Sequence, residues 1–199
     1  MTLVFATNNQ HKLEEVRQML PSVCAVLSLR DIGCEDDIEE TGTTLEANSL
    51  LKARYVAQWI NLHPDIHVDG IFADDTGMEV QALNGQPGVH TARYAGEPKD
   101  DARNRRKLLH ELQRIHADNR HARFRTVITL IRGEKIEQVE GIVNGTIAHE
   151  ETGQGGFGYD SLFVPEGYSQ SFACLTAEQK NSISHRGRAI QHLLEILSL

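Results

Sequence analysis

Two adjacent carboxylates, Asp74 and Asp75 in the segment FADDTG, are the side chains of this sequence best suited to chemistry. They close the apolar run GIFADD over residues 70–75, which predicts a strand that ends at a sheet edge. Side chains alternate between the faces of a strand, so one carboxylate can enter a cleft while the other supports the loop. Carboxylates suit Mg²⁺ and can orient or deprotonate water. D-D-T-G also suits an ordinary turn, so this segment alone only suggests a site.

A second candidate is the segment FATNNQHK, where a polar turn separates an apolar strand over 3–6 from a helix predicted over 12–20. Free backbone N–H groups, the helix dipole and Lys12 at the helix start would together form an anion site. The alternative is that the polar residues of the turn only cap the helix, and taken alone this alternative is favoured. The G-x-x-x-x-G-K-[ST] phosphate loop is absent.

A third candidate is EETGTTLEANSLLKA, residues 39–53. A helix is predicted over 43–59, with a capping box formed by Thr43 and Glu46. Asn48 and Lys52 lie four residues apart and therefore share one helix face. In one interpretation Lys52 contacts a phosphate and a glutamate before the helix binds a metal. In the other, this is a solvated face and the glutamates complement the helix dipole.

The segment TGQGGFGYDS contains three glycines that match G-x-G-x-x-G. A dinucleotide fingerprint is rejected, because no helix opens after the glycines and no βαβ unit surrounds them. Glycines let a backbone come close to a flat ligand, so Phe157 could stack on a base and Asp160 could accept its hydrogen bonds. Alternatively the segment is a flexible loop whose Phe157 and Tyr159 belong to the core.

The segment 178–197 predicts one amphipathic helix, with Ile190, Leu193 and Leu197 on its apolar face. Its first part is crowded with hydrogen-bond donors and cations: Lys180, Asn181, Ser182, Ser184, His185 and Arg186. Cations normally favour the opposite end of a helix, because the N-terminus already carries partial positive charge. A negative or acceptor-rich ligand is therefore expected near these residues.

The remaining sequence predicts a helix over 99–116 and a β-hairpin over 121–132 and 135–148. Helices and strands alternate before this hairpin, which indicates an α/β fold with a mixed sheet. The 199 residues allow a single domain, 1–199, with room for two lobes.

Composition restricts the class of protein. With 40% hydrophobic and 24% charged residues, the chain is typical of soluble globular proteins. The net charge of −8 argues against nucleic acid as a partner. No signal peptide and no membrane span are recognised. The three cysteines lack C-x-x-C spacing, which predicts reduced thiols in a cytoplasmic protein.

Taken in order, five motifs closely resemble those of the inosine triphosphate pyrophosphatase family. They are TNNxxK (7–12), EETGTTLExNxxxKA (39–53), ADDTGxxVxALxGxPGxxxARYAG (73–96), GGFGYD (155–160) and KNxxSHRGxA (180–189). The resemblance implies hydrolysis of deaminated purine nucleoside triphosphates (ITP/dITP and XTP/dXTP) to the monophosphate and pyrophosphate, which keeps them out of DNA and RNA. It also implies an elongated two-lobed α/β fold with a central mixed sheet flanked by helices, a cleft between the lobes, Mg²⁺ as cofactor and a homodimer.

The resemblance also implies roles for individual residues. Asp75 would bind Mg²⁺ and activate water, Glu40 would be the second metal ligand, and Lys12 and Lys52 would act on the triphosphate. Residues implied to bind the substrate are Thr7, Asn8, Asn9, Gln10, His11, Lys12, Thr76, Phe157, Gly158, Tyr159, Asp160, Lys180, His185 and Arg186. The donors around residue 185 would read the 6-oxo group of hypoxanthine or xanthine, where adenine offers a donor instead.

Three positions depart from the family pattern: His11 where glycine is common, Ala47 where an acid is frequent, and Ser161 where proline is common. Two other functions fit parts of the sequence. One is a Maf-like pyrophosphatase for pyrimidine or modified nucleotides, against which the SHR segment speaks. The other is a nucleotide-binding regulator without catalysis, against which Asp75, Lys12 and Lys52 speak.

Overall fold

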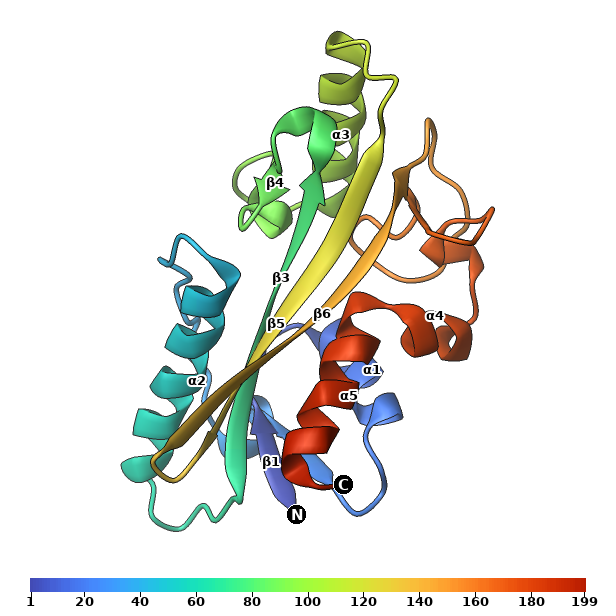
Figure 1. The fold of residues 1–199 in the computed structure, drawn as a ribbon. Helices are drawn as coiled ribbons and strands as arrows, with labels where there is room; N and C mark the ends of the chain where they lie inside the picture. The colour runs from blue at the N-terminus through green and yellow to red at the C-terminus, as the bar shows by residue number, and fades with distance from the viewer. The chain divides into compact units, whose positions relative to one another are not determined.

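Five α-helices and a seven-stranded sheet make up the computed structural model, which describes residues 1–199 (Figure 1). The strand order is β2-β1-β3-β5-β6-β7, with β4 paired to β3. Strand β1 pairs in parallel with β2 and β3, whereas β6 and β7 are antiparallel. The predicted α/β class with a mixed sheet is therefore confirmed. No helix has both the length and the apolar character needed to cross a membrane.

The chain divides into two compact units. Unit 1 comprises residues 1–75, 126–141 and 186–199, and unit 2 comprises residues 76–125 and 142–185. Strands β3 (Gly70–Val80), β5 (His121–Arg132) and β6 (Lys135–Ile147) contribute residues to both. The single two-lobed domain stays a prediction, and each unit is described by itself.

Unit 1 has helices on both faces of its strands. Its further elements are β1 (Thr2–Phe5), α1 (Gln10–Met19), β2 (Ala25–Ser28), α2 (Leu45–Asn61) and all but the first residue of α5 (His185–Leu197). Phe72 of β3 packs in a core cluster with residues of α1 and α5. Its neighbours Ile71 and Ala73 pack in a second cluster with residues of α2. This alternation determines where the two residues that follow, Asp74 and Asp75, must point.

Unit 2 has one core cluster. Leu108 and Leu112 of α3 (Asp101–Arg114) pack with Met78 of β3 and Phe124 of β5. The other elements of this unit are β4 (Pro87–Gly88), β7 (Phe163–Pro165) and α4 (Ala177–Ile183). The predicted helix over 99–116 and the predicted strands over 121–132 and 135–148 are confirmed within one or two residues at each end.

Two predicted boundaries are wrong. The strand predicted to end at Asp75 continues to Val80, so both carboxylates lie inside β3, because Met78 and Val80 prolong its apolar side into the core of unit 2. The capping box predicted from Thr43 is also absent. Helix α2 is capped one residue later by Thr44, whose hydroxyl accepts from the backbone N–H of Ala47. The methyl side chain of Ala47 has no acceptor for the backbone N–H of Thr44, so the second hydrogen bond of a capping box cannot form.

The predicted single helix over 178–197 is also wrong, because two helices meet there. Ser184 has an extended backbone (φ −69°, ψ 161°) and separates α4 from α5. Lys180 therefore lies in the last turn of α4, where the helix dipole favours a cation. The donors and cations at residues 180–186 therefore surround a junction between two helices. Of these residues, only His185 and Arg186 lie at the start of a helix.

Candidate active site

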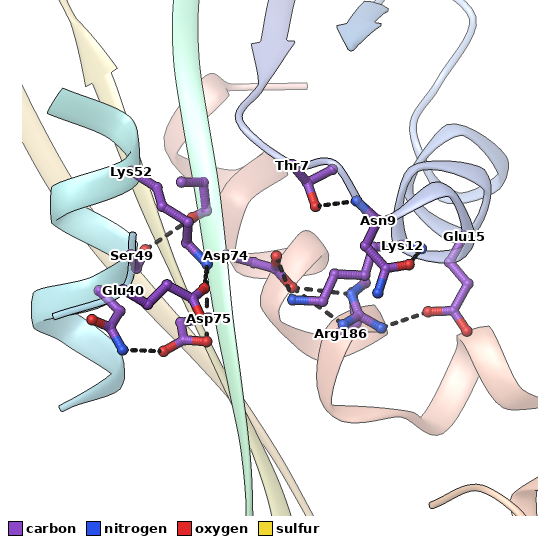
Figure 2. A network of polar contacts seen from close by, with 12 residues as sticks. Thr7, Asn9, Lys12, Glu15, Glu40, Ser49, Lys52, Asp74, Asp75 and Arg186 are labelled. Atoms are coloured by element: carbon purple, nitrogen blue, oxygen red, sulfur yellow. Dashed lines mark hydrogen bonds and ion pairs between the residues drawn. The ribbon is translucent and has the colours of Figure 1, made fainter. Parts of the chain in front are cut away.

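Asp74 is the centre of a buried ion cluster on the α1 and α5 side of β3 (Figure 2). Its Oδ1 accepts from Nζ of Lys12 at 2.9 Å, and its Oδ2 lies 3.2 Å from Nη2 of Arg186. Arg186 also donates through Nη1 to Glu15 at 2.6 Å. Burial alone would raise the pKa of Asp74, but the charges of Lys12 and Arg186 outweigh it and hold the pKa well below its usual range. Asp74 is therefore an ionised anchor for both cations.

Asp75 points to the opposite side of β3, toward α2 (Figure 2). Its Oδ2 accepts from Nδ2 of Asn48 at 3.1 Å, and its Oδ1 lies 3.9 Å from Nζ of Lys52. Lys52 also donates to Glu40. Burial raises the pKa of Asp75 even though Lys52 acts against this shift. For Lys52 the two carboxylates outweigh burial and raise its pKa, so the ammonium is held in its charged form.

The turn between β1 and α1 caps the helix, as the alternative interpretation expects. Asn9 is the N-cap and accepts from the backbone N–H of Lys12 at 3.2 Å. Thr7 in turn accepts from the backbone N–H of Asn9 at 3.1 Å, and Asn8 donates to the carbonyl of Asp36. Capping and anion binding are compatible, because a capped N-terminus still presents a dipole and the side chain of Lys12.

In unit 2, Asp160 organises the glycine-rich loop. Its Oδ2 accepts from the backbone N–H of Phe157 at 2.9 Å and from Nζ of Lys180 at 2.6 Å. The same ammonium lies 4.8 Å from the centre of the Phe157 ring, within the range of a cation–π contact. Gly156 has a φ of +70°, and a Cβ there would lie 2.1 Å from Oδ2 of Asp160. Only glycine therefore allows this close turn.

The first two turns of α3 contact the same loop. Asp101 accepts from the backbone N–H of Gly158 at 3.0 Å, and Arg105 donates to the carbonyl of Gly158 at 2.8 Å. Arg105 and Phe157 are among the residues that line a cavity of about 160 Å³. Asp101 and Arg105 were not recognised from the sequence. Their four-residue spacing on a helix is a signal, but nothing in the sequence shows which loop they contact.

The sequence-predicted residues fall into two groups. Unit 1 brings together Lys12, Glu40, Lys52, Asp75 and Arg186, and unit 2 brings together Phe157, Gly158, Asp160 and Lys180. Tyr159 belongs to the core, as the alternative interpretation expects, and its hydroxyl donates to the carbonyl of Thr91. His185 is buried, with its ring centre 4.7 Å from that of Phe124. Gln10 donates to Glu14, His11 is exposed and Thr76 is half-buried.

Two carboxylates beside Lys52 are the candidate metal ligands in unit 1. No group of three or more His, Cys, Asp or Glu side chains is arranged to hold one. Asp75 and Glu40, however, both lie against Nζ of Lys52 and so are near each other. Mg²⁺ usually takes one or two protein carboxylates together with substrate phosphates and water. Two carboxylates in this position match the number of protein ligands that Mg²⁺ usually takes.

Comparison with known proteins gives matches over nearly the whole chain. The family model described as Ham1 family matches residues 3–196. A dITP/XTP pyrophosphatase of Flavobacterium psychrophilum is 49% identical over 195 residues, with 98% of each chain covered. One of Bacillus subtilis is 43% identical over 196 residues, covering 98% of this chain and 96% of the relative. The Staphylococcus aureus Ham1 protein structure superposes with a TM-score of 0.85 at 38% identity, covering 100% of this chain and 98% of that one.

Proposed function

The chain belongs to the Ham1 family, and from this premise we propose that it is a nucleoside-triphosphate pyrophosphatase. Its substrates are the deaminated purine nucleotides ITP/dITP and XTP/dXTP, and its products are the monophosphate and pyrophosphate. The observation that carries the proposal is the full-length similarity to relatives named dITP/XTP pyrophosphatase, at 43–49% identity. Removal of these nucleotides from the pool keeps them out of DNA and RNA.

The residues around β3 in unit 1 support action on the triphosphate. Lys12 and Lys52 bring two ammonium groups to a chain of net charge −8. A carboxylate holds each lysine side chain in place, so binding of the substrate does not have to pay the entropy of ordering these side chains. Preorganised charges of this kind stabilise phosphoryl oxygens as charge moves between them. The turn 7–11 would add backbone N–H groups at the start of α1.

Asp75 is the proposed general base. Burial raises the pKa of its carboxyl, which makes it a better proton acceptor than an exposed aspartate. A water molecule oriented by Asp75 would form a bond to the α-phosphorus of the triphosphate and lose its proton to this carboxylate. The anhydride bond between the α- and β-phosphoryl groups breaks, and pyrophosphate leaves with the bonding electrons. Asp75 and Glu40 would hold Mg²⁺, which when bound neutralises phosphate charge.

In unit 2, the Phe157 loop would bind the base. Phe157 offers a ring for stacking, and Lys180 offers a donor to a 6-oxo group. With adenine, this donor would face the 6-amino group, which is also a donor, and neither group would have an acceptor. Leaving buried donors without acceptors lowers the binding free energy more than an imperfect fit does. His185 and Arg186, and the core residue Tyr159, stay predictions as substrate contacts. The homodimer, the cytoplasmic location and the two-lobed arrangement with its cleft rest on the family resemblance and belong to the same proposal.

The test is pyrophosphate release from ITP, dITP, XTP, GTP, ATP and UTP, each with and without Mg²⁺. Fast, metal-dependent turnover of the first three, with little from ATP, is expected. Preference for UTP would favour a Maf-like enzyme instead. Binding of ITP without release of pyrophosphate would overturn catalysis and indicate a regulator.

A further inference from the structure

Asn48 makes two hydrogen bonds through one buried side-chain amide. It is the fourth residue of α2 and only 2% exposed. Its Oδ1 accepts from the backbone N–H of Gly42 at 2.7 Å, and its Nδ2 donates to Oδ2 of Asp75 at 3.1 Å. The N–H of Gly42 is only a donor, so it must face Oδ1. The orientation of the amide is thereby fixed, with its NH₂ group directed at the carboxylate.

We propose that Asn48 is a positioning residue that sets Asp75 and the loop carrying Glu40 relative to each other. The inference rests on the proposed function, because it concerns the two carboxylates expected to hold Mg²⁺. Glu40 lies two residues before Gly42, so a fixed Gly42 peptide restricts where its carboxylate can reach. One amide thus contacts one proposed ligand directly and holds the backbone close to the other. Partners that orient metal ligands contribute strongly to metal affinity and activity.

Gly42 shows how closely the loop must approach α2. A Cβ on this residue would lie 2.6 Å from Oδ1 of Asn48 and 2.8 Å from Cβ of Ala47. Both distances are shorter than ordinary van der Waals contacts, so any larger residue would push the loop off the amide. Gly42 therefore offers a second way to disturb the same contact without removing Asn48.

Asn104 provides an internal comparison, because it also accepts a hydrogen bond from the backbone of a preceding loop but does not contact a carboxylate. It is the fourth residue of α3 and fully buried. Its Oδ1 accepts from the backbone N–H of Ala95 at 2.7 Å, as Asn48 accepts from Gly42. Its Nδ2, however, donates to the carbonyl of Ala92 at 2.9 Å. Both asparagines dock a preceding loop on a helix, but only Asn48 directs its NH₂ group at a carboxylate.

The test compares Asn48→Ala with the matched control Asn104→Ala in the full chain. Each variant is measured for urea stability, for the Mg²⁺ concentration that half-activates ITP hydrolysis, and for Mn²⁺ affinity in the presence of inorganic pyrophosphate, after subtraction of the Mn²⁺ that the same pyrophosphate binds without protein. Free Mn²⁺ is followed by its electron paramagnetic resonance signal, so this readout needs no turnover. Both variants are expected to lose stability. Only Asn48→Ala should weaken Mn²⁺ binding and raise the Mg²⁺ requirement, by about 10–100-fold.

Gly42→Ala should shift both metal readouts in the same direction, and it keeps the test decisive if Asn48→Ala fails to fold. The inference is overturned if wild type is active but Asn48→Ala or Gly42→Ala retains the wild-type Mn²⁺ affinity. It is also overturned if Asn104→Ala shifts the metal readouts equally. A wild-type chain that neither hydrolyses ITP nor binds Mn²⁺ would instead overturn the proposed function itself.

Discussion

Replacing Asp74 by asparagine removes the negative charge between Lys12 and Arg186 while keeping the size of the side chain. Asp74 and Arg186 are 1% and 2% exposed, so water cannot replace the lost partner. Removing one member of a buried ion pair typically costs about 3–5 kcal/mol. Arg186 keeps Glu15 as a partner. Burial already lowers the pKa of Lys12, so its ammonium can lose a proton and avoid being a buried charge without a partner. We therefore expect Asp74→Asn to lower the free energy of unfolding by about 3 kcal/mol, at the lower end of this range.

The matched control is Asp31→Asn, which breaks the ion pair with Arg17. These two side chains are 43% and 44% exposed, and exposed pairs contribute only about 0–1 kcal/mol. In a chain of this size, 1 kcal/mol corresponds to about 2–4 °C in Tm. Asp74→Asn should therefore lower the Tm by about 6–12 °C and Asp31→Asn by a few degrees at most.

Equilibrium urea unfolding measures this difference. Trp59 is the only tryptophan and lies in α2, so its fluorescence reports on unit 1, whereas far-UV circular dichroism reports on both units. Coincident transitions by both probes would justify two-state free energies. If Asp74→Asn is no less stable than Asp31→Asn, the buried cluster does not anchor unit 1 as described.

Three further substitutions test the site and the core, with Leu62→Ala as a control for the last. Asp75→Asn should lower kcat by about 10²–10⁴-fold, as expected for loss of a general base, with the fold intact by circular dichroism; a near-normal rate would refute the assignment. Lys52→Ala should lower kcat/KM for ITP through the lost positive charge, and unchanged kcat/KM would remove it from the mechanism. Leu108→Ala should destabilise the core of unit 2 by about 2–5 kcal/mol, whereas Leu62→Ala, at a position 79% exposed, should leave urea unfolding unchanged.

The periodic elements could be predicted from the sequence because their apolar patterns are unambiguous. The strands over 121–132 and 135–148 and the helix over 99–116 are the clearest cases. The end of β3 could not be placed, because D-D-T-G has the composition of a turn. Inside a strand these carboxylates are tolerated because Lys12 and Lys52 neutralise them, and those partners are 62 and 23 residues away in sequence.

The junction between α4 and α5 did have a readable signal. TAEQ at residues 176–179 has the pattern of a capping box, which the structure contains. Ser184 is likewise a residue type that favours helix ends over helix interiors. The apolar periodicity of residues 190–197 suggests one helix, but it does not include residues 176–184, where both signals lie.

Within the site, the sequence indicated the residue types but not their partners. The sequence predicts that Asn48 and Lys52 share one helix face, yet only the structure shows that Asn48 bonds to Asp75. No local pattern marks Glu15 as part of the site, because its partner Arg186 is 171 residues away. Such pairings depend on the order of strands and on which face each helix covers, and local sequence patterns do not contain that information.

Product analysis of a single turnover tests the proposed chemistry most directly. The full-length chain, in excess over dITP and with Mg²⁺ present, is followed by ³¹P nuclear magnetic resonance, with Asp75→Asn as the comparison. Cleavage between the α- and β-phosphoryl groups predicts equal amounts of dIMP and pyrophosphate from the wild type, and little of either from Asp75→Asn. Formation of dIDP and orthophosphate, or equal conversion by the variant, would contradict the proposed reaction and the role of Asp75.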